Sequence, residues 1–322
     1  MTYARIAGVG SCLPDKVLTN QDLEGMMDTS DEWIRERTGI KRRHIAGESE
    51  TTGSLSLIAA QRAMEMAGVT ADDLDLIVVG TCTPDKIIPA TSCIVQRQLG
   101  AKGCAAVDLN AACSGFLYGL DYANRYMRTG GGTTALVIGA ETLSRITNWD
   151  DRTTAVLFGD GAGAIVLETS DEPGVIATHI HANGEFEDLL QTTGGISLGY
   201  DAECDRDGFV RMEGNAVFKR AVGTFDSMAR ETVADLDGHL DDIDWFIPHQ
   251  ANMRIITAAA RKLKMPMERV ICTVDEHANT SAASIPLALD LAIRNGRIKR
   301  GDQILMAAFG AGFTWGSAMV KY

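Results

Sequence analysis

Residues 105–116 read Ala-Ala-Val-Asp-Leu-Asn-Ala-Ala-Cys-Ser-Gly-Phe, and the rest of the chain is organised around this stretch. An apolar run typical of a buried strand precedes Cys113, and residues 116–127 carry apolar side chains at helical spacing. The residues around Cys113 are small, as the sharp corner between a strand and a helix requires in other nucleophile elbows. The sequence therefore predicts a strand–elbow–helix unit with Cys113 at the corner.

The position of Cys113 at this corner predicts a reactive thiol. Free N–H groups at a helix N-terminus favour negative charge, so we expect the thiolate to be stabilised and the pKa of Cys113 to fall. The structural alternative is a buried, inert cysteine, which is what most free cysteines are. The local pattern favours a nucleophile.

Composition narrows the class of protein. The chain has 322 residues and a net charge of −13, which argues against a general nucleic-acid binder. No apolar run reaches the length of a membrane span, and the N-terminus does not read as a signal peptide. The seven cysteines form no C-x-x-C pair, and no Cys/His cluster has zinc spacing. We therefore expect a reduced, cytoplasmic protein that needs neither a membrane nor a metal.

Two glycine-rich segments resemble nucleotide-binding loops but lie in the wrong context. Residues 8–11 lack the third glycine of a dinucleotide fingerprint. Residues 158–164 lead into an apolar strand and not into a helix, so they are better explained as a bend with close backbone packing. The sequence therefore predicts no nucleotide cofactor.

The chain contains an internal duplication. Three pairs of segments match in order: 71–79 with 240–248, 107–114 with 274–281, and 135–140 with 303–308. This order predicts two α/β halves, residues 1–171 and 172–322, joined near the linker-like residues 170–174. In such a pair, the helix N-termini near Cys113 and Asn279 can converge on one pocket.

Two further side chains complete a candidate constellation. His249 closes a buried strand and Asn279 lies at the second elbow, although a strand-end histidine or a helix-capping asparagine can also be purely structural. The small-residue turn 309–313 can present a backbone N–H to an oxyanion. Cys, His and Asn suit acyl transfer through a thioester, but papain-like hydrolases use the same residue types, so the types alone leave the reaction open.

Six runs spread along the whole chain resemble the β-ketoacyl-acyl-carrier-protein synthase III family of the thiolase superfamily. They are residues 31–40 (DEWIRERTGI), 110–116 (NAACSGF), 158–164 (FGDGAGA), 248–252 (PHQAN), 277–284 (HANTSAAS) and 309–316 (FGAGFTWG). The resemblance implies a thiolase-like α/β fold with two duplicated halves in a layered αβαβα arrangement. It also places the family's catalytic Cys, His and Asn at Cys113, His249 and Asn279.

The resemblance further implies a two-step reaction without a cofactor or a metal. Cys113 takes the acyl group from an acyl-CoA, with acetyl-CoA expected, while the N–H groups of Cys113 and Ala311 hold the oxyanion. Malonyl-acyl carrier protein then loses CO2, and its enolate, stabilised by His249 and Asn279, attacks the acyl-cysteine. The product is a 3-oxoacyl-carrier protein that initiates fatty-acid synthesis.

The resemblance also assigns the binding surfaces. The residues expected to bind CoA are Thr29, Trp33, Arg37, Arg152, Asn215 and Asn252, with adenine between Trp33 and Arg152. Cations on two helices beside the mouth are expected to bind the acidic carrier protein, chiefly Lys219, Arg254, Arg261 and Lys262. A homodimer partner is expected to lend Ile88 to the acyl pocket, where a side chain smaller than phenylalanine suits longer or branched starters.

Three other classes of protein compete with this interpretation. One is another thiolase-superfamily enzyme, such as a polyketide-starter or hydroxymethylglutaryl-type synthase. A second is a non-enzymatic acyl-CoA-binding protein, against which the intact Cys113, His249 and Asn279 count. A third is a cysteine hydrolase, which would release free acid without a condensed product.

Overall fold

The computed structural model describes residues 2–204, 206–234 and 242–322. Its strands are β1 (Tyr3–Cys12), β2 (Val17–Thr19), β3 (Arg42–His44), β4 (Leu76–Gly80), β5 (Ala105–Leu109), β6 (Thr134–Thr142), β7 (Asp160–Ser170), β8 (Val175–Ala182), β9 (Leu190–Thr192), β10 (Val210–Met212), β11 (Trp245–Pro248), β12 (Gln303–Gly310) and β13 (Thr314–Lys321). Its α-helices are α1 (Asn20–Glu24), α2 (Asp31–Thr38), α3 (Thr52–Ala67), α4 (Thr91–Leu99), α5 (Gly115–Arg128), α6 (Arg152–Ala155), α7 (Gly214–Ala234), α8 (Met253–Lys262), α9 (Val274–His277) and α10 (Ser284–Arg294).

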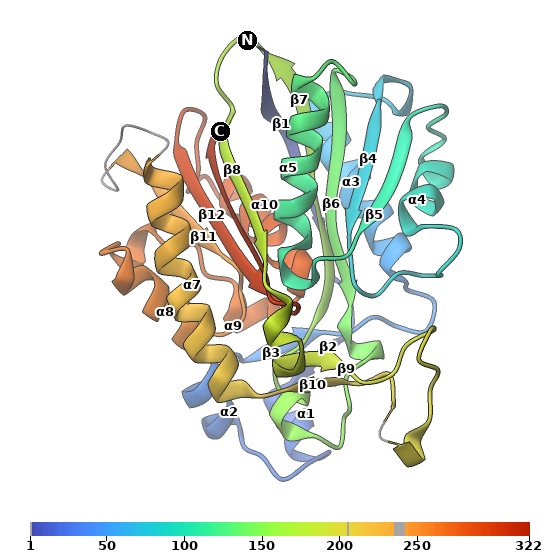
Figure 1. Ribbon diagram of the computed structural model, residues 1–322, viewed down its shortest axis with the longest axis vertical. Coiled ribbons are helices and arrows are strands. Elements are labelled where there is room, and N and C mark those ends of the chain that lie inside the picture. The colour runs from blue at the N-terminus through green and yellow to red at the C-terminus, as the bar shows by residue number, and fades with distance from the viewer. Residues whose placement is uncertain (1, 205, 235–241) are drawn as a thin grey trace.

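The fold has five layers, as expected. One sheet has the strand order β1-β7-β6-β4-β5 and the other β11-β12-β13-β8. Helices α5 and α10 lie between the two sheets (Figure 1) and share one apolar core with both, formed by side chains such as Phe116, Leu289 and Met306. Helix α3 covers the outer face of the first sheet, and α7 and α8 cover that of the second. The αβαβα arrangement is therefore confirmed.

Strand topology repeats between the two halves. Parallel pairing of β4 with β6 recurs between β11 and β12, and antiparallel pairing of β6 with β7 recurs between β12 and β13. The outer pair β7–β1 recurs as β13–β8. Equivalent elements of the two halves start 169 residues apart. This spacing holds for β4 and β11, for α5 and α10, and for β6 and β12. It also holds for the one-turn helices that precede α5 and α10.

Two of the three predicted segment pairs need a corrected register. The constant spacing pairs Ala112 with Ser281, whereas pairing 107–114 with 274–281 was wrong by two residues. Pairing 135–140 with 303–308 was wrong by one. The reason is that β5 runs directly into the first elbow, while the short helix α9 precedes the second, so the similar Val-Asp dipeptides at 107 and 274 are not equivalent.

The chain passes from the first sheet to the second between Ser170, where β7 ends, and Val175, where β8 begins. The division into halves 1–171 and 172–322 stays a prediction, because the shared core joins the two sheets. Within the described residues, no helix combines the length and the apolarity that crossing a bilayer requires.

Candidate active site

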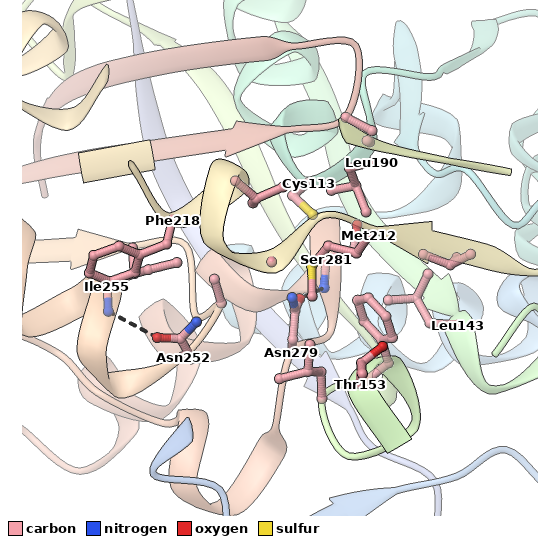
Figure 2. Close-up of a pocket in the computed structure, with 18 of the residues that line it drawn as sticks. Cys113, Leu143, Thr153, Leu190, Met212, Phe218, Asn252, Ile255, Asn279 and Ser281 are labelled. Atoms are coloured by element: carbon pink, nitrogen blue, oxygen red, sulfur yellow. Dashed lines mark hydrogen bonds between the residues drawn. The ribbon is translucent and has the colours of Figure 1, made fainter. Parts of the chain in front are cut away.

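Cys113, His249 and Asn279 all line one cavity of about 630 Å³. Figure 2 shows how Cys113, Asn279 and Ser281 face it from the two elbows, with Leu190 and Met212 on the side of β9 and β10. Both halves of the duplication therefore contribute to the site, and the three side chains that the sequence singled out meet there.

The two elbows have the same local structure. Ala112 and Ser281 have positive φ angles of 45° and 49° and begin the one-turn helices η2 (Ala112–Ser114) and η8 (Ser281–Ala283). In each elbow, an asparagine two residues earlier accepts the backbone N–H through its side-chain oxygen: Asn110 from Ala112 at 3.3 Å and Asn279 from Ser281 at 2.9 Å. Because this bond occupies Oδ1 of Asn279, the amide nitrogen is the end that is left to donate a hydrogen bond.

The turn between β12 and β13 is attached directly to the Cys113 elbow. Thr314 Oγ1 donates to the carbonyl of Ala111 at 2.7 Å, and Ser114 Oγ donates to the carbonyl of Thr314 at 3.2 Å. A Cβ atom added to Gly310 would lie 2.6 Å from the backbone nitrogen of Cys113, so only glycine fits there. Ala311 consequently lines the cavity beside Cys113, where the sequence predicts an oxyanion-binding N–H.

The prediction that the pKa of Cys113 is lowered is wrong. Burial raises the pKa of the Cys113 thiol to about 12, the Ser281 hydroxyl opposes the rise, and the charge of Glu141 adds to it. Loss of water around the sulfur thus outweighs the helix N-terminus. At neutral pH Cys113 is therefore a thiol and not a thiolate.

Alkylation of Cys113 should therefore depend on pH throughout the accessible range. Below the pKa the thiolate fraction rises roughly tenfold per pH unit, so we expect the rate of iodoacetamide labelling to increase from about pH 6 to about pH 9 without a plateau. Mass spectrometry of the labelled peptide measures this rate, and saturating acyl-CoA should protect the residue. A plateau near neutral pH would instead indicate a lowered pKa.

Glu141 is a buried acid close to Cys113, and no local sequence pattern singles it out. It receives hydrogen bonds from the Thr83 hydroxyl at 2.5 Å, the Ser281 hydroxyl at 3.1 Å and the Cys82 backbone N–H at 3.2 Å. Burial raises the pKa of Glu141. This acid connects β6, the loop after β4 and the second elbow beneath Cys113, and only the folded chain brings these segments together.

His249 is held in a single orientation. Its backbone N–H donates to Ala307, which places it at the end of β11, and its Nδ1 lies 2.7 Å from the hydroxyl oxygen of Ser284. That oxygen also accepts the backbone N–H of Gln250 at 3.3 Å. When the Ser284 hydroxyl donates its proton to Nδ1, the ring proton is on Nε2. Burial lowers the pKa of His249 to about 3, so the imidazole is neutral at physiological pH.

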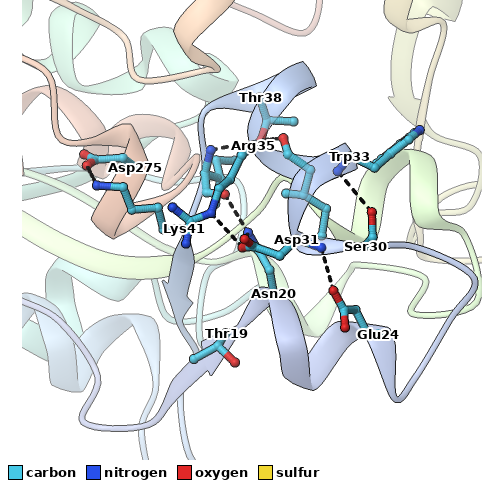
Figure 3. A network of polar contacts seen from close by, with 12 residues as sticks. Thr19, Asn20, Glu24, Ser30, Asp31, Trp33, Arg35, Thr38, Lys41 and Asp275 are labelled. Carbon is cyan, nitrogen blue, oxygen red and sulfur yellow. Dashed lines mark hydrogen bonds and ion pairs between the residues drawn. The ribbon is translucent and has the colours of Figure 1, made fainter.

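Helix α2 presents Trp33 and Arg37 to the mouth of the cavity, and a polar network holds the helix in place (Figure 3). Ser30 caps the helix by accepting the backbone N–H of Trp33 at 3.1 Å. Asp31 accepts hydrogen bonds from Asn20 at 2.8 Å and from Arg35 at 2.7 Å. The position of Trp33 is thus fixed by contacts with the preceding helix and within α2.

The residues predicted to bind CoA are only partly assembled. Those that line the cavity are Trp33, Arg37, Asn215 and Asn252. Thr29 and Arg152 do not, and Arg152 donates to the carbonyl of Asp28 at 2.6 Å. Its guanidinium carbon lies 4.9 Å from the Trp33 ring centre, whereas a base stacked between them needs about 7 Å, twice a van der Waals contact. Arg152 therefore has to move before adenine can enter.

The predicted carrier-binding cations occupy exposed positions on α7 and α8. Arg254 lines the cavity mouth and lies over the Phe218 ring at 5.6 Å, and Lys219 is next to Phe218 in the chain. Arg261 and Lys262 are exposed at the end of α8. Ile88 does not line the cavity of its own chain, and 85% of its surface is exposed.

The layered fold, together with a partly buried cysteine that lines one cavity with a neutral histidine and an asparagine, defines a thiolase-like condensing enzyme. Residues 107–184 match the family described as 3-oxoacyl-[acyl-carrier-protein] synthase III, and residues 234–322 match its C-terminal region. The chain belongs to this family.

Three relatives show how close the similarity is. A beta-ketoacyl-[acyl-carrier-protein] synthase III from Thioalkalivibrio sulfidiphilus is 59% identical over the whole length of both chains. The crystal structure of the 3-oxoacyl-[acyl-carrier-protein] synthase III from Aquifex aeolicus superposes with a TM-score of 0.93 at 47% identity, covering 99% of this chain and 100% of that one. A priming β-ketosynthase from a polyketide biosynthetic pathway gives a TM-score of 0.95 at 35% identity, with 99% and 96% coverage.

Proposed function

We propose that this β-ketoacyl-acyl-carrier-protein synthase III uses Cys113, His249 and Asn279 to condense an acyl-CoA with malonyl-acyl carrier protein. The observation that supports this assignment best is that all three side chains line one cavity. The amide nitrogen of Asn279 is left to donate there, and the neutral His249 ring donates from Nε2 when Ser284 donates to Nδ1. No cofactor is needed, because the thiol, the imidazole and the amide supply all the required chemistry.

The first half-reaction is acyl transfer to sulfur. Acyl-CoA enters past Trp33, and the Cys113 sulfur attacks its thioester carbonyl as the thiol proton leaves. The N–H groups of Cys113 and Ala311 stabilise the tetrahedral oxyanion, and CoA departs as a thiol. The Ser281 hydroxyl, which donates to Glu141, opposes the rise in the pKa of the Cys113 thiol and so favours the sulfur anion during the exchange.

The second half-reaction is decarboxylative condensation. The Nε2–H of His249 and the amide of Asn279 donate to the thioester carbonyl of malonyl-acyl carrier protein. Loss of CO2 leaves an enolate whose oxygen these two donors stabilise, and its carbon attacks the acyl-cysteine. The attack forms the new carbon–carbon bond and breaks the bond between the acyl carbon and sulfur, and the released Cys113 thiolate takes a proton from solvent to restore the thiol. A neutral imidazole suits this role, because a buried imidazolium would be costly.

Charge reversal at Arg254 should weaken binding of the carrier protein without affecting acyl loading. The carrier protein is acidic, and Arg254 is an exposed cation of α8 that lines the cavity. We expect Arg254→Glu to raise the apparent KM for malonyl-acyl carrier protein about tenfold or more, most strongly at low salt. Arg297→Glu, a surface reversal outside the cavity lining, is the control. Unchanged carrier kinetics in Arg254→Glu would contradict the assignment.

The starter acyl group is tested by mass spectrometry of the protein after mixing with acetyl-, butyryl- and isobutyryl-CoA. A thioester on Cys113 and a 3-oxoacyl product support the proposed function, whereas free acid alone identifies a hydrolase.

We further infer a homodimer in which Ile88 enters the partner's acyl pocket, because its side chain is exposed in the single chain. Ile88→Phe should then narrow the range of acyl-CoA starters that the enzyme accepts.

The described cysteines form no disulfide, which supports a cytoplasmic location.

A further inference from the structure

Three potential metal ligands gather outside the catalytic cavity. His179 and His181 lie on β8, and Glu231 lies on α7. One ligand atom from each residue lies within 4.8 Å of the other two. The Glu231 carboxylate is 3.4 Å from Nδ1 of His179 and 2.8 Å from Nε2 of His181. None of the three side chains lines the catalytic cavity, and the proposed reaction does not use them.

The fold arranges this cluster through two elements. Alternate residues of a strand point to the same face, so His179 and His181 project side by side from β8. Helix α7 crosses that face and brings Glu231 between them. The His181 ring also stacks on Trp315 of β13, with ring centres 5.6 Å apart and 27° between the planes, which restricts its rotation.

The spacing and the chemistry of the three side chains fit a zinc ion. With zinc–ligand bonds of about 2.0–2.2 Å, tetrahedral ligand atoms lie about 3.4 Å apart. The two contacts of Glu231 are near that value, and small rotations of these partly exposed side chains bring the two imidazoles into range. Two imidazoles and one carboxylate favour zinc over magnesium or calcium, and partial exposure leaves room for a water ligand.

We propose that His179, His181 and Glu231 form a Zn²⁺ site that ties α7 to the edge strand β8. The sequence does not reveal it by spacing, because a His-x-His pair on a strand needs its third ligand from a helix 50 residues further along the chain. The first turns of α7 carry Asn215 and Phe218 of the catalytic cavity wall, so the ion would fasten the helix that forms this wall.

Titration of the chelator-stripped protein with Zn²⁺ tests the proposal. We expect one equivalent to bind by calorimetry and the melting temperature to rise with Zn²⁺ concentration, because the ion binds the folded state. Glu231→Gln and His181→Gln should each lower the affinity about tenfold or more and abolish the thermal shift. Glu187→Gln, which removes an exposed acid outside the cluster, should behave like the unaltered protein.

A second measurement separates this site from adventitious binding to thiols. Co²⁺ bound to nitrogen and oxygen ligands gives ligand-field absorption without the intense charge-transfer bands of a thiolate complex. The melting temperature of each variant without metal shows whether it folds, and if Glu231→Gln does not, His181→Gln provides the same test. Absence of saturable Zn²⁺ binding, thiolate bands with Co²⁺, or equal affinities in the folded variants and the unaltered protein would overturn the proposal.

Discussion

Cys113→Ala should leave the protein folded and unable to accept an acyl group. Incubation with acetyl-CoA is expected to give no increase in mass, and the rate of condensation should fall by a factor of at least about 10³, because both acyl-transfer steps pass through this sulfur. The CoA-binding groups are not altered, so affinity for CoA should be retained. Intact-protein mass spectrometry and a coupled assay of CoA release measure the two effects.

Cys82 offers a matched control, since it is the other thiol in the lining of the cavity. Its sulfur is 3.4 Å from the Glu141 carboxylate, a contact that a serine hydroxyl can replace. We expect Cys82→Ser to load the acyl group nearly as fast as the unaltered enzyme. Acylation of Cys113→Ala, or its complete loss in Cys82→Ser, would mean that the nucleophile has been assigned to the wrong sulfur.

Replacing either His249 or Asn279 by alanine should separate the two half-reactions. Each substitution removes one donor to the malonyl thioester, so we expect condensation to fall by a factor of about 10²–10³. Acyl loading should change much less, because Cys113 and Ala311 supply the oxyanion donors for that step. Single-turnover loading, measured apart from condensation of the preformed acyl-enzyme, distinguishes the two effects.

Ser284→Ala provides a graded comparison, since Ser284 acts on the substrate only through His249. Without the hydroxyl, the imidazole is free to place its proton on Nδ1, and we expect condensation to slow about tenfold with loading unchanged. Equal losses in loading and condensation for His249→Ala and Asn279→Ala would contradict the assignment of these residues to the second step.

Local sequence patterns predicted the parts of the site that depend on local structure. The small residues around Cys113 indicate an elbow, and the repeated order of strands and helices indicates two halves. The hydrogen bonds that set the environment of the site are long-range. Ser281 donates to Glu141 across 140 residues of the chain, and Ser284 contacts His249 across 35 residues. The lowered pKa expected for Cys113 was wrong because a sequence pattern gives the helix terminus but not the depth of burial.

The predicted adenine site shows a second limit of the same kind. The family resemblance predicts adenine between Trp33 and Arg152, and the structure places the two side chains against each other. It does not leave space for a base, because the arginine occupies the stacking position itself. Whether two groups are far enough apart to admit a ligand depends on side-chain conformations, which spacing along the chain does not determine.

The two halves of the duplicated fold carry different side chains at equivalent positions, and Gly80 is the position that prevents a second histidine. With the constant spacing of 169 residues, Gly80 is the counterpart of His249 and Ala282 that of Cys113. A Cβ atom at Gly80 would lie 2.5 Å from the carbonyl carbon of Gly115, so no imidazole can be housed there without parting β4 from α5. The cysteine and histidine assigned to catalysis therefore have no second copy at the equivalent positions, although the backbones of the two halves are so similar.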